Sequence, residues 1–275
     1  MLYKYCNPEG YKILEDCELK LPYISDVNDV FDCSPYFYIE NNYEKMKARY
    51  LTAFKRKKIP IPHDFDTKFR AQFNDGSLFN CFKYGSEDEF RKRSEKSVLI
   101  CVSKNPLNFL MWAHYAEQHK GLVIEFDFQN ILIENSLGSA GIKMFPVDYR
   151  NERPIIDVLI DPDTKEWSDQ FNDFPLVKSL DWKYEDEYRT VSAPETLLEF
   201  EKYGLVCQKD YDHKKHWFLK INPSSVKSII LGLHSDKFLE QKIINLCKNP
   251  FFQHLKINKI QASESEFRFA QVTIN

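Results

Sequence analysis

The stretch 97-SVLICVSKNPLNFLMWAHYAEQHKGLVIEFD-127 decides the class of the fold. Residues 97–103 form a run rich in β-branched side chains, which predicts a buried strand. Pro106 suits the first turn of a helix, so we expect a helix over residues 107–118 that Gly121 ends. Residues 122–127 predict a second strand directly afterwards. A strand, a short helix and another strand therefore form the centre of the predicted fold.

The remaining segments repeat this mixture in no regular order. Short strands are predicted at residues 2–5, 18–21, 182–191, 216–221, 229–232, 256–260 and 267–272, and helices at residues 11–17 and 236–247. Because strands and helices do not alternate regularly, the pattern favours an α+β fold over a doubly wound parallel sheet. We expect a mixed or antiparallel split sheet with flanking helices, in a single α+β domain that spans residues 1–275.

Two segments differ from the rest of the chain in charge. Residues 41–96 contain 14 Lys and Arg against 8 Asp and Glu, a net charge of +6, in a chain whose net charge is −3. Their pattern predicts a basic helical insertion. Residues 151–173 carry six acidic side chains after Arg153 and predict a solvated acidic loop.

The composition excludes several classes of protein. With 43% apolar and 29% charged residues, the chain has the composition of a soluble globular protein. It has no apolar run of the roughly 18 residues that a membrane span needs, and no signal peptide, so we expect a cytoplasmic protein that does not bind a membrane. Seven cysteines at irregular spacings fit free thiols. The sequence contains neither a Walker A loop nor a G-x-G-x-x-G motif, the two common glycine-rich phosphate-binding motifs. The stretch most similar to them, residues 138–141, predicts a turn.

The first candidate site lies at the end of the helix predicted over residues 107–118. Trp112 and Tyr115 share one stripe with His119 at the helical period, and His114 lies on a neighbouring stripe. Such side chains could stack on a planar ring and offer it a hydrogen bond. The alternative is a core helix whose aromatic side chains pack and whose histidines cap the last carbonyls.

The second candidate site lies on the strand predicted over residues 182–191. Alternation at period two places four charged side chains on one face, namely Lys183, Glu185, Glu187 and Arg189. Two carboxylates between two cations could be tuned for catalysis. The alternative is a ladder of salt bridges on an edge strand.

The third candidate is the acidic loop at residues 28–32, which contains Asp29 and Asp32. Carboxylate and amide oxygens suit Mg²⁺ or Ca²⁺. The alternative is an Asx-turn or a helix cap. Since the loop has no fixed ligand spacing, we favour the cap and assign no metal site.

Four stretches of the chain together resemble a bacterial family known as domain of unknown function twenty-nine seventy-one. They are residues 2–5, residues 28–32, residues 110–116 with 120–121, and residues 181–189. The W-x-H-Y-A motif at residues 112–116 and the W-x-Y-E-x-E-Y-R motif at residues 182–189 are specific. Val30 stands where the family usually has proline.

The layout is similar, more weakly, to that of the ADP-ribosyltransferases, with a ring-bearing first strand, an aromatic helix and a late strand with Glu-x-Glu. This resemblance implies an enzyme that binds NAD as its substrate. Lys4 and Tyr5 would lie on the adenosine side. The nicotinamide would be held by Trp112, His114 and Tyr115.

The same resemblance implies roles for the two glutamates. Cleavage of the C–N bond to nicotinamide builds positive charge at C1′ of the ribose, which a fixed carboxylate stabilises. Glu187 would stabilise that charge, and Glu185 would orient or deprotonate a protein or nucleic-acid acceptor. An NAD-dependent ADP-ribosyltransferase-like or NAD-cleaving enzyme of this kind would suit an effector of a bacterial antiviral defence or toxin system.

Two other functions are left open by the sequence. A metal-dependent nuclease could use the acidic residues Asp29, Asp32, Glu125, Asp127 and one of the paired glutamates, with Lys120 near the phosphate. A non-catalytic nucleic-acid-binding module could contact phosphates through Lys55, Arg56, Lys57 and Lys58. Its stacking surfaces would be Phe54, Phe65, Phe69, Phe73, Phe79 and Phe82, for which the alternative is the core of an amphipathic helical subdomain.

Overall fold

The structure is a computed structural model that describes residues 1–133, 141–211 and 213–274. The turn predicted at residues 138–141 lies almost wholly outside them. Contacts divide the chain into two compact units. The first unit comprises residues 1–26, 97–147 and 180–275, and the second comprises residues 27–96 and 148–179. The basic segment at residues 41–96 thus belongs to a larger unit that a later part of the chain completes.

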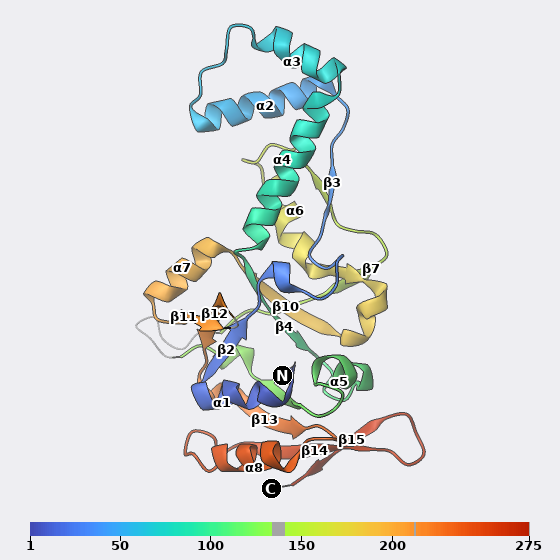
Figure 1. The fold of residues 1–275 in the computed structure, drawn as a ribbon, viewed down its shortest axis with the longest axis vertical. Coiled ribbons are helices and arrows are strands. Elements are labelled where there is room, and N and C mark those ends of the chain that lie inside the picture. Colours follow the sequence, from blue (N-terminus) through green and yellow to red (C-terminus); the bar gives the residue numbers. More distant parts are fainter. Residues whose placement is uncertain (134–140, 212, 275) are drawn as a thin grey trace. The chain divides into compact units, whose positions relative to one another are not determined.

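An eight-stranded sheet forms the centre of the first unit (Figure 1). Its order is β15 (Phe269–Thr273), β14 (Lys256–Ala262), β13 (Val226–Leu231), β5 (Leu122–Phe126), β1 (Leu2–Cys6), β4 (Val98–Ser103), β10 (Glu187–Ser192) and β6 (Phe145–Pro146). The β13–β14 pair is parallel and the other pairs are antiparallel. The predicted α+β class with a mixed sheet is confirmed.

Both faces of this sheet are covered, which explains why its central strands are apolar. On one face, Tyr5, Val123 and Ile230 pack against helix α5 (Phe109–Tyr115). On the other, Leu122 and Ile124 belong to the larger core. That core includes side chains of α1 (Lys12–Asp16), α7 (Pro194–Lys202), α8 (Lys237–Leu246) and the three-stranded sheet of β11 (Val206–Tyr211), β12 (Lys214–Lys220) and β2 (Glu18–Leu21).

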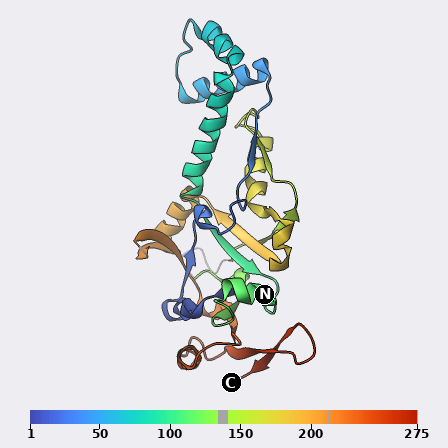
Figure 2. The same cartoon turned by 45° about the vertical axis from the view of Figure 1, so that its right-hand side comes forward.

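Four longer helices and two small sheets build the second unit. The helices are α2 (Tyr43–Lys57), α3 (Phe65–Asn74), α4 (Ser77–Ser94) and α6 (Lys165–Asp173). Strand β3 (Tyr36–Tyr38) pairs with β8 (Ile155–Asp157), and β7 (Asp148–Arg150) pairs with β9 (Val177–Ser179), both in parallel. Figures 1 and 2 both show α6 beside α4. The second unit has its own apolar core, which includes Met46, Phe69 and Leu78.

Short 3-10 helices connect many of these elements. They are η1 (Pro8–Tyr11), η2 (Ile24–Asp26), η3 (Phe128–Asn130), η4 (Phe174–Leu176), η5 (Leu180–Glu185) and η6 (Pro223–Ser225). Within the described part of the chain, no helix is long and apolar enough to cross a membrane.

The segment at residues 151–173 corrects one prediction. It was expected to be a solvated acidic loop, but it contains β8 and α6. Ile156 of β8 is fully buried, and the Thr164 side chain caps α6 by accepting a hydrogen bond from the Trp167 backbone N–H. An N-cap threonine and buried apolar residues therefore outweigh the acidic composition.

Two boundaries also differ from the prediction. Helix α5 ends at Tyr115, because Glu117, Gln118 and His119 adopt left-handed backbone angles. Residues 180–185 form the 3-10 helix η5 rather than a strand, and Asp186, with a φ of 45°, separates η5 from β10. His119 consequently does not belong to the helical stripe, and Glu185 is not on the strand that carries Glu187.

Candidate active site

A row of polar side chains crosses five neighbouring strands of the eight-stranded sheet. The strand registers pair Glu187 with Ser103, Ser103 with Tyr3, Tyr3 with Glu125, and Glu125 with Ser228. Directly paired residues point to the same face of a sheet. That face is the one under α5, because Tyr5, two residues after Tyr3, contacts Trp112 of α5.

The middle of this row is held by hydrogen bonds. The Tyr3 hydroxyl donates to Glu125 Oε1 at 3.1 Å, and the Ser228 hydroxyl donates to Glu125 Oε2 at 2.6 Å. Burial, followed by the neighbouring Glu125 carboxylate, raises the pKa of Tyr3 to about 12. Tyr3 therefore remains a protonated hydrogen-bond donor at neutral pH.

A buried ion pair lies at the β10 end of the row. Arg189 Nε donates to Glu187 Oε1 at 2.9 Å, and Arg189 Nη2 donates to Glu187 Oε2 at 2.6 Å. Arg189 has no exposed surface, and Glu187 is 6% exposed. The alternative of a salt-bridge ladder on an edge strand does not hold, because β4 and β6 flank β10 on both sides. Because a buried charge without a partner is costly, the two side chains stay paired, and the two hydrogen bonds fix their orientation.

A second buried carboxylate comes just before β10. Glu185 is 2% exposed, and its Oε1 accepts a hydrogen bond from the Tyr115 hydroxyl at 2.5 Å. The Ser103 hydroxyl donates to the Glu185 backbone carbonyl at 2.6 Å. Glu185 is thus held by the last residue of α5 and by β4.

One asparagine positions both α5 and the segment that carries Glu185. The Asn108 side-chain oxygen accepts hydrogen bonds from the backbone N–H groups of Leu110 and Met111, as an N-cap does. Its Nδ2 donates to the Tyr184 carbonyl at 2.7 Å. We call Tyr115, Glu185, Glu187 and Arg189 the buried charge cluster.

Cys101 borders this cluster but is a poor nucleophile. It stands opposite Arg189 in the β4–β10 register. Burial, and then the neighbouring Glu187 carboxylate, raises the pKa of the Cys101 thiol well above its usual value. The Lys4 ammonium donates to the Cys101 carbonyl at 3.0 Å, so Lys4 also reaches this region. The thiol stays protonated, as expected of a packing residue.

Two residues assigned to NAD binding have a different role in the structure. Trp112 is fully buried, and its Nε1 donates to the Pro106 carbonyl at 2.9 Å. Tyr5 is 7% exposed, its hydroxyl donates to the Asn105 carbonyl, and its ring meets that of Trp112 edge-on at 5.5 Å. The two rings attach α5 to the sheet and leave no face open for a ligand.

His114 differs from both, because its side chain is exposed. Its ring lies 6.2 Å from that of Tyr184 and 6.4 Å from that of Tyr115. The ring of Trp182 lies 5.9 Å from that of Tyr184. The structure therefore brings His114, Tyr115 and Glu185 together around the end of α5. The more accessible rings are those of η5 rather than Trp112 and Tyr5.

Three of the acidic residues proposed for a nuclease have structural partners elsewhere. Asp127 caps η3 by accepting from the Gln129 backbone N–H. Asp29 accepts from the Phe31 backbone N–H, as in an Asx-turn. Asp32 forms a buried ion pair with Lys178 at 3.3 Å within the second unit. Among the residues that the structure describes, no group of three or more His, Cys, Asp or Glu side chains is placed to hold a metal ion.

The basic run at residues 55–58 is exposed at the end of α2. Lys58 ends the helix with a φ of 53°, and cations in a last turn are favourable to the helix dipole. The phenylalanines near this run were predicted to form either stacking surfaces or an apolar core. Most of them form a core, because Phe65 and Phe69 are buried and Phe54, Phe73 and Phe82 pack against it. Phe79, at 38% exposed, is the exception.

Some residues of the site were not assigned from the sequence. Ser103 and Asn108 received no role, although the Asn-Pro-x-Asn sequence at residues 105–108 is an N-cap signal. Arg189 is named in the second candidate site, as one of two cations on a face with the glutamates. Its complete burial depends on the rest of the fold, which alternation within one strand does not reveal.

A comparison with known protein families matches the part of the chain that contains this site. Residues 111–190 match the model of a family described as "Protein of unknown function (DUF2971)". This confirms the resemblance to domain of unknown function twenty-nine seventy-one. The matched range contains all four residues of the buried charge cluster. No curated protein and no solved structure matches the chain. The weaker resemblance to ADP-ribosyltransferases therefore gains no support from the comparisons.

Proposed function

We propose that the first unit is an NAD-cleaving, ADP-ribosyltransferase-like enzyme that uses the buried charge cluster as its reaction centre. The observation that carries this proposal is the 2.5 Å hydrogen bond from the Tyr115 hydroxyl to the buried Glu185 carboxylate, two residues before the Glu187–Arg189 pair in the chain. Glu185 and Glu187 bring two carboxylates and Arg189 brings one guanidinium, so these three side chains have a formal charge of −1. Such a site suits a substrate on which positive charge develops.

The burial of the carboxylates strengthens this chemistry. A charge in a medium of low dielectric acts on a nearby charge more strongly than it would in water. Arg189 binds both oxygens of Glu187 and so keeps its orientation fixed before the reaction. The Tyr115 hydroxyl likewise holds the Glu185 carboxylate by donating to its Oε1. Because Arg189 already neutralises Glu187, we assign the stabilisation of the ribose charge to Glu185, in place of Glu187 as the resemblance implied. Glu187 and Arg189 together contribute to the electric field of the site.

The ring-binding surface in this proposal differs from the one expected from sequence. Trp112 and Tyr5 are packing residues, whereas His114 is exposed and Tyr184 and Trp182 are half-buried. The Tyr184 ring lies 6.2 Å from the His114 ring and 5.9 Å from the Trp182 ring. We assign the nicotinamide to this surface.

The test is the release of nicotinamide from NAD, measured with candidate protein and nucleic-acid acceptors, each with and without EDTA. The proposal expects release that EDTA does not reduce. Y115F removes the hydroxyl that holds Glu185 and should lower the rate about 10- to 100-fold, the scale of one hydrogen bond to a charged group. Y203F, at an exposed tyrosine, is the matched control and should leave it unchanged. Equal rates for Y115F and the parent protein would refute the assignment of Tyr115.

A second candidate, nucleic-acid binding, is favoured by the consecutive exposed cations Lys55, Arg56, Lys57 and Lys58. Changing all four to Gln should weaken binding to DNA or RNA and reduce the slope of log K against log salt by up to about four. The measurement is fluorescence anisotropy of a labelled oligonucleotide at several salt concentrations. An unchanged slope would exclude these residues from phosphate contact.

A further inference from the structure

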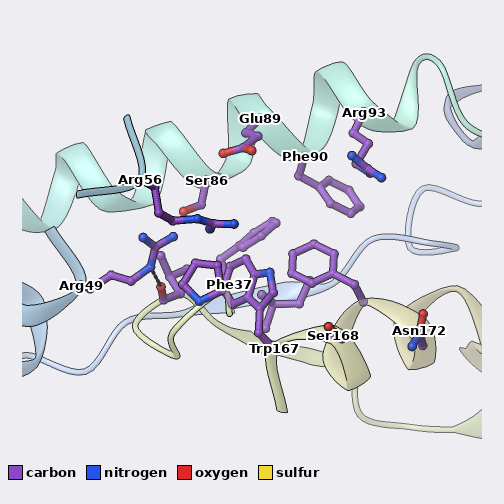
Figure 3. Close-up of a pocket in the computed structure, with 14 residues that line it drawn as sticks. Phe37, Arg49, Arg56, Ser86, Glu89, Phe90, Arg93, Trp167, Ser168 and Asn172 are labelled. Atoms are coloured by element: carbon purple, nitrogen blue, oxygen red, sulfur yellow. Dashed lines mark hydrogen bonds between the residues drawn. The ribbon is translucent and has the colours of Figure 1, made fainter. Parts of the chain in front are cut away.

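The second unit contains a pocket of about 450 Å³ that the proposed reaction does not use (Figure 3). Its walls come from α2, α4, α6, β3 and β8, all within this unit. The volume lies in the range of pockets that hold small ligands, about 300 to 1,000 Å³. Its lining includes three arginines, Arg49, Arg56 and Arg93, with Glu89 as the one acidic residue. Four aromatic residues form much of the remaining wall, namely Phe37, Phe90, Trp167 and Phe171.

Arg49 has donors that the described protein leaves unused. Its Nε donates to the Val158 carbonyl at 3.1 Å, a bond that fixes the plane of the guanidinium. Over residues 1–133, 141–211 and 213–274, neither of its terminal amino groups has a hydrogen-bond or ion-pair partner. Burial, and then the positive charge of Arg56, lowers the pKa of Arg49, while Asp161 and Glu89 oppose this. A half-buried cation with free donors in a positive field would be stabilised by an anion.

Arg56 adds a second cation on the same side of the pocket. It comes from the last turn of α2, two turns beyond Arg49, and pairs loosely with Asp163 at 3.2 Å. Figure 3 shows the guanidinium groups of Arg49 and Arg56 directed into the same space between α4 and α6, with Arg93 toward the other end. Arginine is suited to phosphate because its planar group can donate two parallel hydrogen bonds.

The aromatic side of the pocket suits a planar ring. Trp167 of α6 lies under Arg49, whose guanidinium is 5.5 Å from the ring centroid. Phe171, one turn further along α6, is 4.9 Å from Trp167. Ser168 and Asn172, also on the lining, provide hydroxyl and amide groups that could bind the edge of a polar ring.

We propose that this pocket binds a nucleoside phosphate, with Arg49 and Arg56 on the phosphate and Trp167 against the base. A purely apolar ligand would leave the free donors of Arg49 unpaired, and inorganic phosphate would leave the aromatic wall unfilled. The pocket belongs to one unit and is independent of the reaction centre proposed above.

The proposal can be tested by titration calorimetry of the full chain with AMP, ADP and ATP, and separately with adenosine and inorganic phosphate. At least one nucleotide should bind, and adenosine and phosphate should each bind at least 10-fold more weakly. R49Q should reduce nucleotide affinity about 10- to 100-fold, the scale of charge-assisted hydrogen bonds. W167A should weaken binding of nucleotides but not that of phosphate.

The matched control is R91Q, which removes a cation from α4 outside the pocket, where Arg91 pairs with Asp88 and Glu95. R91Q should bind nucleotide as the parent protein does. R49K keeps the charge without the planar group, and it should also lose affinity while retaining the parent melting temperature. No nucleotide binding by the parent at millimolar concentration, an equal loss in R91Q, or binding of oligonucleotides alone would overturn the proposal.

Discussion

Arg189 carries a positive charge with no exposed surface, and Glu187 binds it through both carboxylate oxygens. Removing the guanidinium in R189M leaves Glu187 buried without its main counter-charge. We expect the free energy of unfolding to fall by about 3 to 5 kcal/mol. Chemical denaturation of the variant and of the parent protein measures this difference.

The double variant E187M/R189M is the control for that prediction. Replacing both members of a buried pair with apolar side chains of similar volume is often close to neutral. The double variant should therefore be more stable than R189M alone. A loss below about 1 kcal/mol in R189M, or a double variant less stable than the single one, would contradict the described pairing.

The cysteines provide a second prediction for single residues. Burial and Glu187 raise the pKa of Cys101, whereas Cys81 is exposed and its side chain lies on α4. Since the thiolate is the reactive form, iodoacetamide at pH 8 should modify Cys81 well before Cys101. Peptide mass spectrometry over a time course gives the order. Early labelling of Cys101 in the folded protein would contradict its burial.

The turn between α5 and β5 depends on a close backbone approach at Gly121. A Cβ built there would lie 2.0 Å from the Cys6 carbonyl oxygen on β1, so the backbone itself would have to move. We expect G121A to destabilise the protein by about 1 to 3 kcal/mol, as overpacking does. Thermal unfolding monitored by circular dichroism would measure the change.

Gly85, in the middle of α4, is the matched position. A Cβ there meets no atom within 4 Å, and alanine is the better helix former. G85A should therefore raise stability by up to about 1 kcal/mol. If G121A and G85A changed the stability in the same direction, the close backbone approach at Gly121 would not be what the turn depends on.

The elements themselves were predictable to different degrees. Strands β4 and β5 were predicted because their apolar runs end at clear turn signals, and α8 because Asp236 caps an apolar pattern. The 3-10 helix η5 was not, because its alternation of aromatic and charged residues imitates a strand. The left-handed angle at Asp186, which starts β10 at Glu187, leaves no mark in the pattern.

The division of the whole molecule into two units could not be predicted from local sequence patterns. The charge of residues 41–96 marked a helical segment, but not that residues 148–179 complete its unit. That association depends on strand pairs such as Tyr36 with Ile155, which are far apart in the sequence. The motifs named Tyr115, Glu185, Glu187 and Arg189, but the burial of Arg189 and its pairing with both oxygens of Glu187 depend on the surrounding fold.

If the buried charge cluster cleaves NAD as proposed, the rate of cleavage depends on the negative charge of Glu185, which E185Q removes. Glutamine keeps the shape of the side chain and can still accept the Tyr115 hydrogen bond, but it removes the charge. E117Q, at an exposed glutamate just after α5, is the matched control. The measurement is the initial rate of nicotinamide release from NAD by parent, E185Q and E117Q at equal concentration, with folding checked by circular dichroism. We predict a rate about 10² to 10³ lower in folded E185Q and an unchanged rate in E117Q. Release by E185Q at the parent rate, or a parent protein that releases no nicotinamide with any acceptor, would contradict the claim.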